Sequence, residues 1–93
     1  MRNSALAFFI GRRAQTLQRR VDERDEVLIH QACDDILDEL NRIDGDTSDI
    51  KEHLEEINEI IEDREGDLSG WNDWKPVLDD SSAVINQLQS YFS

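Results

Sequence analysis

The chain has few of the residues that end helices, cross-link the backbone or bind metals. Its 93 residues contain one cysteine, one proline, four glycines and two histidines. Because Cys33 is the only cysteine, no intramolecular disulfide can form, which suits a reducing compartment. A zinc site needs three or four clustered ligands. We therefore predict no disulfide framework, no metal site and no cofactor.

Motifs of catalysis are also missing. The sequence contains no Gly-rich phosphate loop, no nucleophile elbow and no cluster of histidines and cysteines. His30 and Cys33 lie three positions apart with Asp34 nearby, and we interpret them as residues at the edge of the core. A chain this short buries a small core and leaves little room for a pocket. The sequence therefore predicts a protein that is not an enzyme.

Long apolar runs are absent as well. The longest, Ala5 to Ile10, is far shorter than the roughly 20 residues that a membrane-spanning helix requires. An arginine-rich start without acids is also a feature of transit peptides, but here the apolar face continues from Ile10 into Val21. We predict no transmembrane segment and expect a protein of the cytoplasm or of a larger soluble assembly.

Positive charge is scarce beyond the first 20 residues. That segment carries five arginines and no acid, whereas residues 21–93 carry five basic residues against all 22 acidic ones, a charge of −17. The chain thus divides into a basic, apolar helical arm at 1–20, continuous with an acidic three-helix body at 21–93. Because the body repels nucleic acid, direct nucleic-acid binding is not expected. An acidic, lysine-poor surface also suits a high-salt environment, and this alternative stays open.

What the sequence does contain is a helical repeat of apolar residues. From Asn3 to Ile43 they recur mostly every three or four positions, which keeps one face of a helix apolar. A single helix of about 40 residues would be roughly 60 Å long. Since that exceeds the size of a compact domain, we expect part of it to project or to pair with another chain. Charges of both signs from Arg19 to Glu26 indicate a solvated waist or a kink within this helix.

Two further helices are predicted. The Asp-Gly pair at 44–45 is typical of a helix end, and the short connection folds a second helix, at about 48–64, back against the first. Its apolar face has a 4-3-4 spacing: Ile50, Leu54, Ile57 and Ile61. Pro76, suited to a first turn, predicts a third helix at about 75–92. The predicted fold is all-α, a small helical bundle with a projecting N-terminal arm.

The main interaction site is predicted in this arm. Its contact residues are Leu6, Phe8, Phe9, Ile10, Arg12, Arg13, Arg19 and Arg20. A helix end that is apolar nearly all round requires burial on several sides. It either packs on its own body, inserts into another subunit or protein, or lies on a membrane surface. Burying the four apolar side chains would contribute roughly 6–12 kcal/mol before entropy, and the arginines would align the arm against an acidic body.

Two other surfaces are candidates for binding. The second helix carries an acidic stripe opposite its apolar face, formed by Glu52, Glu55, Glu59 and Glu62. Each step along the stripe rises about 5–6 Å, close to the spacing of phosphates along a nucleic-acid strand. Trp71 and Trp74 either cover the open end of the helical hairpin or form a binding hot spot.

These patterns favour one function and leave a second open. The first is a non-enzymatic structural or protein-interaction module, which self-associates into a homo-oligomer or docks on a protein partner through its N-terminal arm. The alternative is an acidic inhibitor that mimics nucleic acid and occupies the cleft of a basic nucleic-acid-binding protein.

Overall fold

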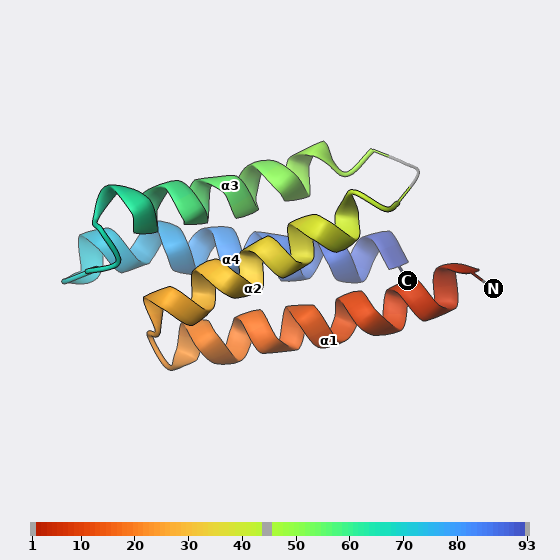
Figure 1. The fold of residues 1–93 in the computed structure, drawn as a ribbon, viewed down its shortest axis with the longest axis horizontal. Coiled ribbons are helices and arrows are strands. Elements are labelled where there is room, and N and C mark those ends of the chain that lie inside the picture. Colours follow the sequence, from red (N-terminus) through yellow and green to blue (C-terminus); the bar gives the residue numbers. More distant parts are fainter. Residues whose placement is uncertain (1, 44–45, 93) are drawn as a thin grey trace.

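Four antiparallel helices make up the described part of the chain. The computed structural model describes the backbone of residues 2–43 and 46–92 and the side chains of residues 8–43 and 46–90. The helices are α1 (Arg2–Asp22), α2 (Glu26–Leu40), α3 (Ser48–Asp63) and α4 (Trp71–Phe92), and these residues contain no strand. Successive helices run in opposite directions (Figure 1). The predicted all-α bundle is confirmed, with four helices in place of three.

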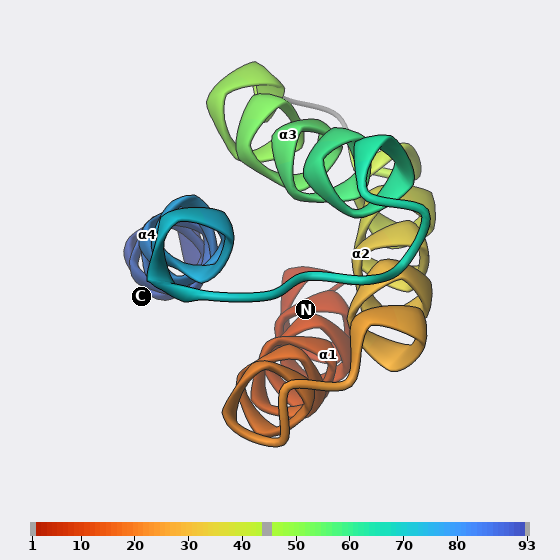
Figure 2. The same ribbon diagram turned by 90° about the vertical axis from the view of Figure 1, so that its left-hand side faces the viewer.

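The helices surround one core. Seen from the end, they form a ring in which α1 packs against α2 and α4, and α3 packs against the same two helices (Figure 2). This is the up-and-down arrangement of a four-helix bundle with short connections. Every helix contributes to the core, whose fully buried large side chains include Ile10, Leu17, Ile29, Ile36, Leu40, Leu54, Ile57, Val77 and Val84.

The prediction of a single long helix from Asn3 to Ile43 is wrong, because the chain turns back at residues 23–25. As a result α1 does not lead away from the body but lies along α2 and α4 (Figure 1). Only its first turns extend past the ends of the neighbouring helices. The radius of gyration, 12.8 Å, is close to the roughly 12 Å expected for a compact domain of this length.

The break is made by a helix-closing motif that contains no glycine. Arg24 adopts a left-handed φ of 57°. Its N–H donates to the Val21 carbonyl at 3.1 Å, and the Asp25 N–H donates to the Arg20 carbonyl at 3.2 Å. These two bonds satisfy the last carbonyls of α1 in the Schellman pattern. Asp25 then caps α2, since its carboxylate accepts a hydrogen bond of 3.1 Å from the Leu28 N–H.

The second half of the fold follows the predicted pattern more closely. All four residues of the 4-3-4 seam on α3 are buried, and α3 ends through the same motif, with Glu65 at φ 53° and Gly66 at φ 75°. The helix α2 ends at Leu40 with Asn41 as its cap, a few residues before the predicted end at 44–45, and residues 44–45 themselves lie outside the described residues. The last helix begins at Trp71, earlier than predicted, so that Pro76 lies in its second turn.

Candidate functional site

The N-terminal part of α1 exposes two aromatic rings. Phe8 and Phe9 are 60% and 54% exposed, and their rings meet edge to face with centroids 5.9 Å apart. The Arg12 guanidinium lies over the Phe8 ring, 5.8 Å from its centroid. Ile10, predicted to be part of the same contact surface, is instead buried in the core. The side chain of Leu6 lies outside the described residues.

An open groove runs along the same half of α1. It has a volume of about 510 Å³ and lies between α1 and α4. Its lining consists of apolar side chains and glutamines: Ile10, Gly11, Ala14, Gln15, Gln18, Ile85, Leu88 and Gln89. At Gly11 an added Cβ would meet no atom within 4 Å, so the backbone of α1 is accessible there. Phe8 lies one helical turn before Gly11 and so next to the groove, whereas Phe9 shares the face of Arg13, which is turned towards α2.

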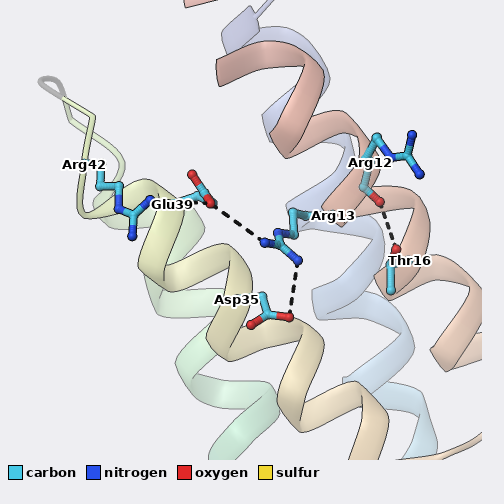
Figure 3. Close-up of polar contacts among 6 residues, drawn as sticks. All are labelled: Arg12, Arg13, Thr16, Asp35, Glu39 and Arg42. Atoms are coloured by element: carbon cyan, nitrogen blue, oxygen red, sulfur yellow. Dashed lines mark hydrogen bonds and ion pairs between the residues drawn. The ribbon is translucent and has the colours of Figure 1, made fainter. Parts of the chain in front are cut away.

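The arginines of α1 differ in their contacts. Arg13 extends across to α2, with Nη1 3.5 Å from Asp35 Oδ2 and Nη2 3.9 Å from Glu39 Oε1 (Figure 3). Arg20 pairs with Glu23, the first residue after α1, at 3.1 Å. Arg12 and Arg19 are exposed and form no ion pair with a described residue. Arg13 thus aligns α1 with its own acidic body, while two positive charges stay available at the surface.

The two tryptophans have different environments. Trp74 is 9% exposed and packs in the core, with the Arg24 guanidinium 5.2 Å from its ring centroid. This cation–π contact joins the start of α4 to the turn between α1 and α2. Trp71 is 63% exposed.

The acidic stripe lies on the surface of α3. Glu52, Glu55, Glu59 and Glu62 are all exposed. Glu62 Oε1 lies 3.0 Å from His30 Nε2, and the other nitrogen of this ring lies 3.2 Å from Asp34 Oδ2. The stripe therefore presents its carboxylates to solvent, and Glu62 also contacts His30 of α2.

Cys33 is placed for packing and not for chemistry. Its side chain is fully buried. Burial, and secondarily the negative charges of Asp34 and Asp80, raise the pKa of the thiol to about 12. Because the thiolate is the reactive form, Cys33 is inert at neutral pH.

A cluster of three polar residues, which the sequence pattern did not predict, joins α3 to α4. Ligand atoms of His53, Glu56 and Asp80 all lie within 4.8 Å of one another. His53 Nδ1 is 3.0 Å from Asp80 Oδ1. Two features of the sequence indicate the cluster. His53 and Glu56 are three positions apart on one helix, and Asp80 lies between Val77 and Val84 on the apolar face of α4.

The electrostatics of this cluster are unbalanced. The negative charge of Asp80, followed by a hydrogen bond between the two carboxyl groups, raises the pKa of Glu56 above its usual value. Asp80 is 7% exposed, and its Oδ2 is buried without a hydrogen-bond partner. When Glu56 is ionised it has no hydrogen to donate, so this oxygen lacks a donor.

The site residues and fold together define an acidic four-helix bundle with an aromatic surface on α1. Comparison with known protein families, with curated proteins and with solved structures found no match for this chain. Among the described residues, no helix has both the length and the apolar character needed to cross a membrane.

Proposed function

We propose that this protein is a non-enzymatic interaction module that self-associates through the N-terminal half of α1. The observation that carries the proposal is the exposure of Phe8 and Phe9 in the same half of α1 that lines the α1–α4 groove. Exposed aromatic side chains at the edge of an apolar groove are typical of binding surfaces. The exposed rings are not needed to hold α1 in the bundle, because Ile10, Leu17 and Val21 already anchor it in the core.

A second copy of the chain is the occupant that fits this surface. Phe8 lies one helical turn before Gly11, which lines the groove, so a twofold axis near Gly11 would bring the Phe8 ring of each copy to the groove of the other. Charge supports the same arrangement. Arg12 and Arg19 extend from the basic segment, while residues 21–93 of a second copy carry a charge of −17.

The expected dimer is weak. In this arrangement the two Phe8 side chains, each 60% exposed, lose that exposure, which contributes roughly 2–4 kcal/mol. Association itself costs about 4–15 kcal/mol in lost freedom of motion. Contacts along the groove add to the favourable side, so we expect a dissociation constant in the micromolar to millimolar range.

Replacing both rings, Phe8→Ala with Phe9→Ala, should abolish self-association because the inserted groups are removed. Sedimentation equilibrium from about 10 μM to about 1 mM of protein measures the dissociation constant directly. We expect this constant to rise at least about tenfold, which requires a loss of only about 1.4 kcal/mol of binding free energy. Helix content should not change, because both rings are exposed.

The matched control uses other exposed apolar residues. Val27 and Trp71 are 72% and 63% exposed, and they lie at the starts of α2 and α4, at the opposite end of the bundle (Figure 1). Val27→Ala and Trp71→Ala should leave the dimer intact. A wild-type chain that stays monomeric at 1 mM, or a double variant that associates as well as wild type, would contradict the proposal.

The exposed stripe on α3 supports a second candidate, an acidic inhibitor that mimics nucleic acid. Changing Glu52, Glu55, Glu59 and Glu62 together to Gln should then prevent the protein from displacing duplex DNA from a basic DNA-binding protein. Displacement by the unmodified protein should weaken steeply with salt, as phosphate contacts do. The fold should persist, since each change is at the surface. If the four-fold variant displaces DNA equally well, or if wild type displaces none, this candidate is excluded.

A further inference from the structure

The cluster on α3 and α4 has the composition of a metal site. His53 offers an imidazole nitrogen, and Glu56 and Asp80 each offer a carboxylate oxygen. The first two lie one helical turn apart on α3, and the third approaches them from α4, so the cluster joins two packed helices. Their ligand atoms are all within 4.8 Å of one another. In a tetrahedral zinc site with bonds of about 2.0 Å, neighbouring ligand atoms are about 3.3 Å apart, so small side-chain rotations would complete the geometry.

A second observation is that one carboxylate oxygen of the cluster has no partner. The Asp80 side chain is 10% exposed, and its Oδ2 is buried with no hydrogen-bond donor. A buried carboxylate oxygen without a partner is costly. Glu56 offers a second carboxylate beside this one and adds a like charge, which a shared cation would neutralise.

We propose that His53, Glu56 and Asp80 form a binding site for a divalent transition-metal ion, with Zn²⁺ as the best-matched ion. Imidazole favours zinc and its neighbours in the first transition series over Mg²⁺ and Ca²⁺, which prefer oxygen ligands alone. Three protein ligands leave a fourth position for water or for a donor from another molecule. Since Glu56 is exposed and His53 half-buried, this position faces solvent. The ion would also connect α3 to α4.

The other histidine provides a matched control. His30 also has two carboxylate neighbours, but they lie on opposite ring nitrogens: Asp34 at Nδ1 and Glu62 at Nε2. One ion cannot bind both carboxylates and the ring from such positions. Non-specific binding to the acidic surface would involve both histidines, whereas the proposed site involves His53 alone.

The test is a calorimetric titration of the full chain, treated with EDTA and then dialysed, with Zn²⁺ at pH 7. We expect one saturable site per chain. His53→Gln and Glu56→Gln should each weaken Zn²⁺ binding at least about tenfold, because even changes outside the ligand shell typically cost 10–100-fold. His30→Gln should change the affinity less than about twofold. Circular dichroism checks the fold of each variant. Because Glu56 is exposed, Glu56→Gln is the variant expected to disturb the fold least.

Nuclear magnetic resonance of the wild-type protein gives a second readout without any substitution. Zn²⁺ should shift the ring signals of His53 and leave those of His30 in place, and a tenfold excess of Mg²⁺ should not reverse the shift. Absence of saturable binding, equal weakening by His30→Gln, or a shift confined to His30 would each overturn the proposal.

Discussion

Trp74→Ala should lower the free energy of unfolding by about 3–5 kcal/mol, the usual loss for a buried large aromatic side chain. Trp74 is 9% exposed, packs in the core and lies beneath the Arg24 guanidinium. Its removal would leave a cavity where α4 meets the turn between α1 and α2. For a domain of this length the melting temperature should fall by at least about 12 °C. Urea unfolding monitored by circular dichroism measures the change.

Trp71→Ala is the control for this experiment. Trp71 is 63% exposed, so its replacement should change stability by no more than about 0.5 kcal/mol. If Trp74→Ala does not fold, Trp74→Phe retains most of the apolar volume and should show a smaller loss in the same direction. Equal effects of the two alanine substitutions would show that Trp74 is not part of the core.

Removing residues 1–22 should abolish cooperative unfolding. This deletion takes α1 out of the bundle and with it the core side chains of Ile10, Leu17 and Val21. Three fully buried aliphatic side chains contribute roughly 5–9 kcal/mol, which is comparable to the whole stability of about 5–14 kcal/mol expected for a chain of this length. Thermal unfolding followed by circular dichroism should therefore lose its sigmoidal transition.

A shorter deletion distinguishes the core of α1 from its exposed end. Removing residues 1–9 keeps Ile10 and all later core residues, so the chain should fold and unfold cooperatively. It should also lose self-association, since Phe8 and Phe9 are absent. A cooperative transition in the 1–22 deletion would mean that α1 is dispensable for the bundle and would restore the prediction of a separable arm.

The helices themselves could be predicted from the sequence because their pattern is local. The 4-3-4 repeat on α3 identifies the residues that are buried, and the same spacing places the acidic stripe on the opposite, exposed face. Apolar residues at helical spacing also identify the core positions Leu17 and Val21 of α1. Side-chain periodicity follows from the helix geometry, which is independent of what the helix packs against.

The break at residues 23–25 could not be predicted in the same way. A helix end of this type normally carries glycine in the left-handed position, and here Arg24 occupies it. The oppositely charged pairs around it are compatible with a continuous helix. What favours the turn is packing: a straight helix would leave the apolar face of α1 without a partner, whereas folding back buries it against α2 and α4. That gain outweighs the local cost of about 1–2 kcal/mol for a left-handed arginine.

The sequence by itself therefore determined the helical character, the apolar faces and the charge separation, because each depends on neighbours within a few positions. Only the tertiary structure decided which apolar groups are already buried and which polar groups meet. It placed Ile10 in the core and left Phe8 and Phe9 exposed. It also brought Asp80 to within hydrogen-bonding distance of His53 across 27 positions of sequence. Contacts between residues so far apart are set by how whole helices pack, and no local pattern records them.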